Sequence, residues 1–187
     1  GKSTLLSLMA GLDDPDGGSV LIGGERMSHR GPARQARLRG GLVSVMTQTN
    51  SLLEHLSVLG NVRLAASLRR SGGGRAGGGR WPASGPRPSP EQLLADLGLA
   101  HRRRARPSAL SGGEVARANL AVALVGAPVV LLADEPTAEV SRPEEAGILA
   151  LLRAPGGPRA ATILVTHSRA VAAAADRVIE LVDGKIR

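Results

Sequence analysis

The strongest constraint on the fold is a series of short apolar runs that alternate with helix-like segments in the second half of the chain. Such runs cover residues 129–133 and 161–166, and a further strand is predicted at 177–182. The helix-like segments of this half are 113–125, 143–153 and 170–175. A strand that is apolar on both sides belongs in a parallel sheet covered on both faces, and parallel strands need crossover helices. The predicted fold class is therefore α/β.

The first half of the chain carries weaker signals. Residues 2–11 have a helical pattern that ends at Gly11, with Leu5, Leu8, Met9 and Leu12 on one face. Turn-forming residues fill 13–18. The remaining predicted elements are strands at 19–22 and 42–47 and helices at 57–70 and 90–97, whereas the basic stretch 33–39 is assigned no element.

Residues 71–90 form a Gly- and Pro-rich stretch that is predicted to be a mobile surface loop without helix or strand. The net charge of +8 gathers around it, because nine arginines lie between residues 69 and 106 against Glu91 and Asp96. We interpret this charge as a solvated basic linker. Binding to anionic lipid headgroups or to nucleic acid is the alternative. Trp81, the only aromatic residue, is interpreted as a surface residue.

The chain length and composition fit one domain, 1–187, because 187 residues with 42% hydrophobic content can bury a core. The absence of cysteine excludes disulfides and thiolate metal sites. No run approaches the roughly 20 apolar residues that span a bilayer, and the start does not resemble a signal peptide. We therefore expect a soluble, cytoplasmic domain.

The chain opens with Gly1-Lys2-Ser3-Thr4, which matches the end of the phosphate-binding loop G-x-x-x-x-G-K-[ST]. In such a loop, backbone N–H groups at a helix start surround phosphate oxygens, while a lysine supplies a point charge and a hydroxyl binds Mg²⁺. Lys2 and Ser3 fit these roles. A capped helix start without function is the alternative, because only four residues match.

A second motif, Asp134-Glu135-Pro136-Thr137, directly follows the apolar run 129–133. Ligands of open α/β sheets bind at the carboxyl ends of the strands, where these residues are predicted to lie. Asp134 can hold Mg²⁺ and Glu135 can accept a proton from an attacking water. The alternative is a pair of solvated turn carboxylates.

The run 161–166 is followed by His167, at the same predicted edge of the sheet as Asp134 and Glu135. This placement favours a functional histidine over an ordinary surface one. His29, His55 and His101 have no comparable setting and are interpreted as surface residues.

A third motif, Leu110-Ser111-Gly112-Gly113-Glu114, opens a predicted helix. Free N–H groups, a hydroxyl and two residues without side chains make a second anion site, although a plain helix cap is the alternative. One nucleotide needs only one such cradle. The second site therefore predicts a head-to-tail dimer in which it binds a nucleotide held by another copy.

Taken together, these motifs resemble those of the ATP-binding-cassette (ABC) ATPases. GKST, the glutamine Gln48 after a strand, LSGGE, LLADEPT and ILVTH stand in the family's order and near its spacing, and the resemblance covers the chain apart from 71–90. LLADEPT and QTNSLLEHLSVLGNV look most like the ATPases of lipoprotein-releasing and macrolide-export complexes. The resemblance implies a P-loop NTPase fold with a mostly parallel sheet and a small helical subdomain, about 57–126.

The resemblance also implies a role for each motif. The residues expected to bind ATP, its Mg²⁺ and its phosphates are Gly1, Lys2, Ser3, Thr4, Gln48, Asp134 and His167, with Ser3, Gln48 and Asp134 on the metal. Glu135 is expected to be the general base, and Ser111, Gly112 and Gly113 to contact the nucleotide of the opposite protomer. The implied partner is a transmembrane permease subunit, so the ATPase would lie on the inner face of the cell membrane. No nucleic-acid partner is expected.

Three departures from the family pattern are visible. The N-terminal strands, an adenine-stacking aromatic and the front of the phosphate loop are absent, which predicts an N-terminally truncated chain. Ser141 stands where the family usually has an aspartate, and 71–90 replaces part of the helical subdomain.

These departures leave three functions open. The first is the ATPase of an exporter, the second is a regulatory, cell-division-type ABC ATPase, and the third is a catalytically impaired fragment.

Overall fold

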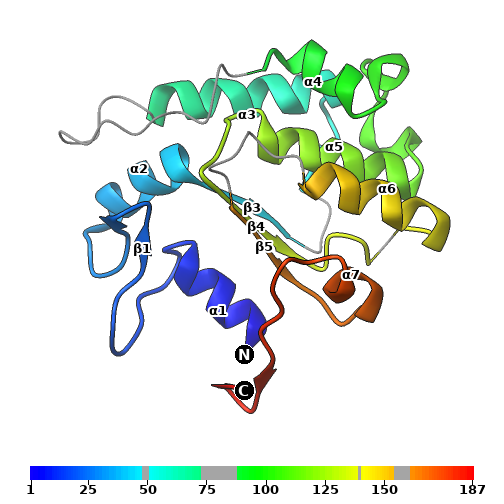
Figure 1. Ribbon diagram of the computed structural model, residues 1–187. Helices are drawn as coiled ribbons and strands as arrows, with labels where there is room; N and C mark the ends of the chain where they lie inside the picture. Colours follow the sequence, from blue (N-terminus) through cyan, green and yellow to red (C-terminus); the bar gives the residue numbers. More distant parts are fainter. Residues whose placement is uncertain (48–50, 73–87, 139, 154–160) are drawn as a thin grey trace.

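A three-stranded parallel sheet forms the centre of the computed structural model, which describes residues 1–47, 51–72, 88–138, 140–153 and 161–187 (Figure 1). Its strands are β3 (Val43–Met46), β4 (Val130–Asp134) and β5 (Ala161–Val165). Strand β4 lies in the middle, with Val130 opposite Val43 on one side and Ala161 on the other. Within the described ranges β5 pairs with β4 alone. The predicted parallel sheet and the α/β class are confirmed.

The sheet is covered on both faces because side chains alternate along its central strand. Leu131 and Ala133 pack among helices α3 (Val58–Gly72), α5 (Gly112–Leu124) and α6 (Arg142–Arg153). Leu132 packs on the other face with helices α1 (Lys2–Met9) and α2 (Pro32–Leu42). All three side chains are at most 1% exposed.

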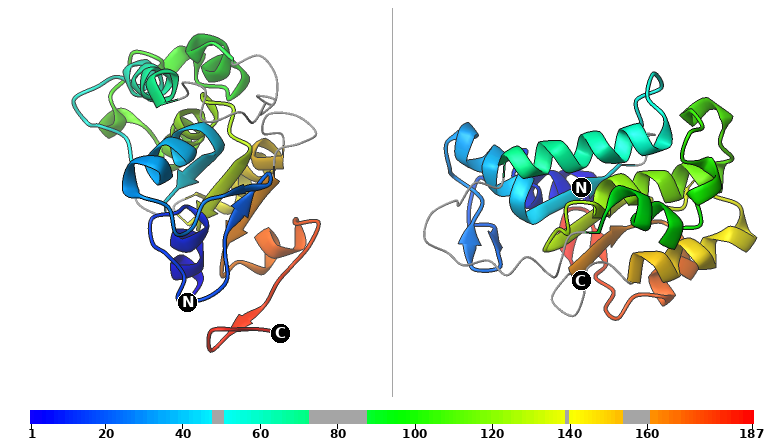
Figure 2. Two further views of the ribbon diagram at one scale, coloured as in Figure 1. Left: turned by 90° about the vertical axis from the view of Figure 1, so that its left-hand side faces the viewer. Right: turned by 90° about the horizontal axis from the view of Figure 1, so that it is seen from above.

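A group of helices gathers at the end of the molecule far from both chain termini (Figure 2). It contains α3, α4 (Pro90–Asp96) and two short 3₁₀ turns, η1 (Ala100–Arg102) and η2 (Pro107–Ala109). The first turn of α3 is satisfied from this group, because Val58 N–H donates to the Ala105 carbonyl at 2.9 Å and Leu59 N–H to the Arg103 carbonyl at 3.0 Å. The initial N–H groups of a helix have no acceptor inside the helix, so these bonds define where α3 begins.

The remaining elements are small. Strands β1 (Leu21–Ile22) and β2 (Glu25–Arg26) form one antiparallel hairpin, and β6 (Leu181–Val182) and β7 (Lys185–Ile186) form another. Helix α7 is Arg169–Ala173. No helix in the described ranges is both long and apolar enough to cross a bilayer.

Local structure differs from the sequence predictions at several points, and the stretch without a predicted element is helical. The stretch 33–39 lies within helix α2, which starts with Pro32 at a first-turn position and buries Leu38 and Leu42 one turn apart. Arginine is a good helix former, but two buried leucines are too few to produce a periodic signal.

The predicted apolar face of the first helix coincides only in part with its buried face, because Met9 packs against the core. Leu6 and Ala10 are buried, while Leu5 and Leu12 are 36% and 62% exposed. Leucine and methionine occupy four of the positions 5 to 9, so two helical stripes were compatible with the pattern and tertiary contacts select one.

The predicted strand 177–182 is reduced to its last two residues. The chain turns at Asp183 and Gly184, where φ is 48° and 76°. Two consecutive positive φ values are those of a two-residue hairpin turn, so the predicted turn is present and returns the chain into β7. The strand predicted at 19–22 is likewise shorter, at 21–22. Most of the loop 71–90, with Trp81, lies outside the described residues.

Candidate functional site

The start of α1 meets the end of β4 at one edge of the sheet. The Ser3 hydroxyl donates a hydrogen bond to Asp134 Oδ2 at 2.9 Å, across 131 residues of sequence. Asp134 reaches this position because it shares the alternation of Leu132, whose side chain faces α1. Lys2 is half-buried on the same first turn, whereas Ser3 and Thr4 are exposed. The first turn of α1 thus presents its N–H groups beside a carboxylate at the strand end.

The residue after β4, Glu135, has an unusual backbone conformation and a largely buried side chain. Its φ is +47°, in the left-handed region that a non-glycine residue rarely adopts. Its N–H extends the sheet by donating to the Val165 carbonyl at 2.9 Å. Its side chain is 16% exposed. A backbone held in this region costs about 1–3 kcal/mol, so the surrounding contacts must define it.

The two carboxylate oxygens of Glu135 differ in their partners. Oε2 accepts a hydrogen bond from the Thr166 hydroxyl at 3.0 Å. Oε1 is buried without a hydrogen-bond partner among the described residues. His167 Nε2 lies 3.8 Å from Oε1, beyond hydrogen-bonding distance, and the His167 side chain is 79% exposed. A buried acceptor of this kind is suited to receive a proton or a hydrogen bond from a bound molecule.

Glu145 of α6 joins the loop after β4 to the loop after β5. Its Oε1 accepts from the Thr137 hydroxyl at 3.2 Å and from the Ser168 hydroxyl at 3.3 Å. The Ser168 hydroxyl also caps α7 by accepting from the Val171 N–H. One buttressing carboxylate therefore connects three elements around Glu135.

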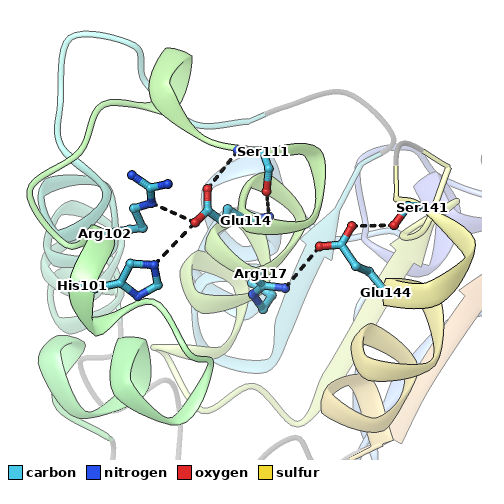
Figure 3. A network of polar contacts seen from close by, with 7 residues as sticks. All are labelled: His101, Arg102, Ser111, Glu114, Arg117, Ser141 and Glu144. Atoms are coloured by element: carbon cyan, nitrogen blue, oxygen red, sulfur yellow. Dashed lines mark hydrogen bonds and ion pairs between the residues drawn. The ribbon is translucent and has the colours of Figure 1, made fainter.

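The other predicted anion site lies at the start of α5, on the opposite face of the sheet from α1 (Figure 1). Ser111 and Glu114 form a reciprocal capping box, in which Ser111 N–H donates to Glu114 Oε2 at 2.9 Å and Glu114 N–H donates to Ser111 Oγ at 3.3 Å (Figure 3). Ser111 Oγ accepts in this bond, so its own proton remains available for donation. Ser111 and Gly112 are exposed, and Gly113 is buried.

Glu114 is held by side chains of η1 as well as by the cap. Arg102 Nε donates to its Oε1 at 2.8 Å, and His101 Nε2 lies 3.6 Å from the same oxygen. The Ser111 N–H, and after it the Arg102 guanidinium, lower the pKa of the Glu114 carboxyl. These contacts favour the charged form because they donate to it or carry the opposite charge. His101 is 65% exposed and is a surface residue, as predicted.

A second carboxylate covers Gly113. A Cβ on this glycine would lie 2.3 Å from Glu144 Oε1, so the carboxylate occupies the space that a side chain would take. Glu144 also accepts from the Ser141 hydroxyl at 2.7 Å and lies 4.0 Å from Arg117 Nη1 (Figure 3). Ser141, at the position where an aspartate was expected, therefore bonds within its own chain.

The structure brings some of the sequence-predicted residues together and leaves others apart. Ser3, Asp134, Glu135 and His167 gather at the carboxyl edge of the sheet, with Gly1, Lys2 and Thr4 on the adjoining turn of α1. Ser111, Gly112 and Gly113 lie at the start of α5 instead. Gln48 lies outside the described residues.

Sequence reasoning missed several residues that support these sites. They are Arg102, Thr166, Ser168, Glu144 and Glu145. For Thr166 a signal existed, because it stands between the strand and His167. The others have none in the sequence, since their partners are set by the packing of α5 and α6.

The oxygen atoms at the sheet edge fit a Mg²⁺ ion. Ser3 and Asp134 offer a hydroxyl and a carboxylate 2.9 Å apart, which are the hard oxygen donors that Mg²⁺ prefers. The described ranges contain no cluster of three or more His, Cys, Asp or Glu that could hold a metal by itself. This donor set matches a Mg²⁺ ion bound by one or two protein groups together with water and substrate phosphates.

Comparison with known sequences identifies one family. Residues 1–138 match the model of the family described as ABC transporter. The "Lipoprotein-releasing system ATP-binding protein LolD" of Xanthomonas euvesicatoria pv. vesicatoria is 38% identical over 188 residues, which covers 100% of this chain and 73% of that protein. The "Macrolide export ATP-binding/permease protein MacB 1/2" of Paracoccus denitrificans is also 38% identical, over 100% of this chain and 26% of that protein.

Solved structures agree in fold. A dimeric structure of a post-hydrolysis state of the ATP-binding cassette MJ0796, bound to ADP and Pi, superposes with a TM-score of 0.81 at 26% identity. The match covers 100% of this chain and 78% of that one. A second dimeric structure of MJ0796, a bacterial ABC transporter cassette, superposes with a TM-score of 0.78.

Proposed function

This chain belongs to the ABC transporter family, and we propose that it is the ATP-hydrolysing subunit that drives export through a separate membrane protein. The observation that carries the proposal is the arrangement at the sheet edge. The Ser3–Asp134 pair lies next to a Glu135 carboxylate whose buried Oε1 has no partner among the described residues. This arrangement combines a metal and phosphate site with a proton acceptor, as ATP hydrolysis requires.

The nucleotide phosphates bind at the first turn of α1. Gly1, Lys2, Ser3 and Thr4 supply backbone N–H groups, and Lys2 supplies a positive charge, at the positive end of the helix dipole. Ser3, Asp134 and Gln48 hold Mg²⁺, which neutralises charge on the phosphates when bound. The short Ser3–Asp134 distance supports this assignment for two of the three residues.

Glu135 acts as the general base. Water attacks the γ-phosphorus, the bond to the β-phosphate oxygen breaks, and the water proton goes to Glu135 Oε1. His167 donates to a γ-phosphate oxygen from its exposed position beside Glu135. ADP and inorganic phosphate are released, the two ligands bound in the dimeric structure of MJ0796.

The second anion site completes the nucleotide site of another copy. Ser111, Gly112 and Gly113 lie on the face of the sheet away from α1, so one chain does not place both sites on one nucleotide. A head-to-tail dimer does so twice by symmetry. The dimeric state of the MJ0796 cassette supports the formation of a dimer.

The membrane partner is a permease subunit, and export is the direction of transport. The relatives named above belong to a lipoprotein-releasing system and to a macrolide exporter, and the second carries its permease in the same chain. The ATPase works at the inner face of the membrane. Its helical subdomain 57–126, in which α3, α4 and α5 pack together, contacts the permease. Co-purifying the partner and counting its spans separates this function from the regulatory alternative.

ATP hydrolysis by the longest chain that the reading frame encodes tests the proposal. Glu135→Gln removes the base and keeps the size of the side chain, so we expect kcat to fall about 10²–10⁴-fold. Glu25→Gln is the matched control. Glu25 is a half-buried carboxylate in strand β2 that forms an ion pair with Arg34 of α2. A decrease of that size in the first variant alone supports the proposal. Equal, negligible rates in wild type and Glu135→Gln contradict it and favour the catalytically impaired fragment.

A further inference from the structure

The Thr166 hydroxyl makes two hydrogen bonds, one as acceptor and one as donor. Its Oγ1 accepts from the Ser168 N–H at 2.9 Å, and it lies 3.0 Å from Glu135 Oε2. An ionised carboxylate can only accept, so the hydroxyl proton points at Glu135. The backbone bond from Ser168 fixes this direction, because an N–H group can only donate.

Thr166 belongs to a closed network of hydrogen bonds that runs through Ser168, Glu145 and Thr137 back to the loop of Glu135. Ser168, which donates to Thr166 through its N–H, donates to Glu145 through its hydroxyl. Glu145 also accepts from Thr137, which lies two residues after Glu135 in the same loop. The loop that carries the base is thus held at Glu135 by Thr166 and at Thr137 by Glu145.

This hydrogen-bond network accounts for the position of Glu135 Oε1. With Oε2 bound by Thr166, the carboxylate plane cannot rotate freely, and Oε1 stays in its buried position without a partner. The contact also opposes relaxation of a backbone that is held at a φ of +47°. A proton acceptor that is already oriented before the water arrives lowers the barrier, because no reorganisation is needed during the reaction.

We propose that Thr166 is a positioning residue for the general base: its hydroxyl fixes Glu135 Oε2 and thereby presents Oε1 to the attacking water. Thr166 acts through Glu135 and does not touch the nucleotide. The inference rests on the proposed role of Glu135 and adds to it the residue that orients the carboxylate.

Two substitutions separate the hydroxyl from the shape of the side chain. Thr166→Val keeps the branched shape and removes the donor, whereas Thr166→Ser keeps the donor. A hydrogen bond to a charged group is strong enough that its loss lowers kcat about 10–100-fold. We expect this decrease in Thr166→Val with KM for ATP unchanged, and a kcat within about threefold of wild type in Thr166→Ser.

A double-mutant cycle tests whether Thr166 acts through the carboxylate. In the Glu135→Gln background, Thr166→Val should lower the residual rate by less than about twofold, since the base it orients is gone. A folding defect would lower the rate in both backgrounds equally, so the cycle remains informative if the variant is unstable.

Three results overturn the inference: wild-type kcat in Thr166→Val, an equal loss in Thr166→Ser, or the same fold-loss in both backgrounds. Failure of the proposed function is distinct from these results. In that case wild type and Glu135→Gln are equally inactive, before Thr166 is changed.

Discussion

Single contacts around Glu114 show how a charged residue can organise the start of a helix. Its carboxylate accepts from Ser111 N–H and from Arg102, while its own N–H donates to the Ser111 hydroxyl. The carboxylate also sits at the positive end of the α5 dipole. The Glu114 N–H therefore orients the Ser111 hydroxyl, while the Glu114 side chain satisfies the Ser111 N–H and links η1 to α5.

The lowered pKa of Glu114 predicts how stability depends on pH. A carboxyl whose pKa is lower in the folded state adds stability above its unfolded pKa of about 4.3, and this contribution is lost as pH falls through the folded pKa. Glu114→Gln keeps the capping geometry and removes the charge. We expect it to lower the free energy of unfolding by less than about 1 kcal/mol at pH 7 and to have a smaller effect near pH 3.

Urea unfolding of both proteins at the two pH values measures this difference. An equal difference at pH 7 and pH 3 would contradict the role of the charge.

At the scale of elements, a buried amide joins the segment before α3 to the helix itself. Asn61 is 5% exposed, and its Oδ1 accepts from Leu53 N–H at 2.7 Å. Its Nδ2 donates to the carbonyls of Leu53 at 3.2 Å and Ser57 at 3.1 Å. The segment that follows β3 is therefore held against the first turns of α3 by both ends of one side chain.

Substitution of Asn61 should loosen this contact. Asn61→Leu fits a buried site but leaves the Leu53 N–H without its acceptor, at a cost of about 1–3 kcal/mol in the free energy of unfolding. The Leu53 carbonyl loses one donor and keeps the Leu56 N–H. Leu68→Ala on the same helix is the control, because Leu68 is 65% exposed and should change stability by less than about 0.5 kcal/mol. Chemical denaturation compares the midpoints. Equal, small shifts in both variants would show that the amide contributes nothing.

At the scale of the whole molecule, the two helix starts proposed to bind anions lie on opposite faces of one sheet. The start of α1 belongs to the face that buries Leu132, and α5 belongs to the face that buries Leu131. Burial of both faces by helices follows from the parallel sheet, and it separates the two sites in one chain. The proposed composite nucleotide site therefore needs one helix start from each of two chains.

Mixing two inactive variants tests this combination. Lys2→Ala disables the phosphate site and Ser111→Ala the opposing site, so each homodimer has two defective composite sites. A mixed head-to-tail dimer has one composite site with both partners intact. Mixing equal amounts should restore about a quarter of wild-type ATPase activity, because half of the dimers are mixed and each has one working site.

Glu135→Gln mixed with Lys2→Ala is the control. Both changes lie on the same side of the interface, so every composite site in the mixture stays defective and no activity should return. Restoration in this control, or none in the test mixture, would contradict the head-to-tail arrangement.

Much of the architecture can be predicted from the sequence because local chemistry determines it. The apolar run 129–133 has the length and composition of a buried strand, and a polar residue directly after such a strand lies at the edge of the sheet. Asp134 and Ser3 each have a predicted Mg²⁺ role from their own motifs, and the family resemblance implies that they share one site, although 131 residues separate them. Ser111 and Glu114 have the spacing of a capping box, which is a property of four consecutive residues.

The tertiary structure alone decides the contacts that cross between elements. The buried stripe of α1 is selected by the packing of α1 against the sheet. The basic stretch 33–39 is helical because Leu38 and Leu42 of α2 are buried in the core. The Thr166–Glu135 bond and the bridge through Glu145 depend on how neighbouring strands and α6 are placed. Periodicity describes one element at a time, so the sequence determines the strands and the motifs at their ends. The orientation of the Glu135 carboxylate is decided when those elements pack together.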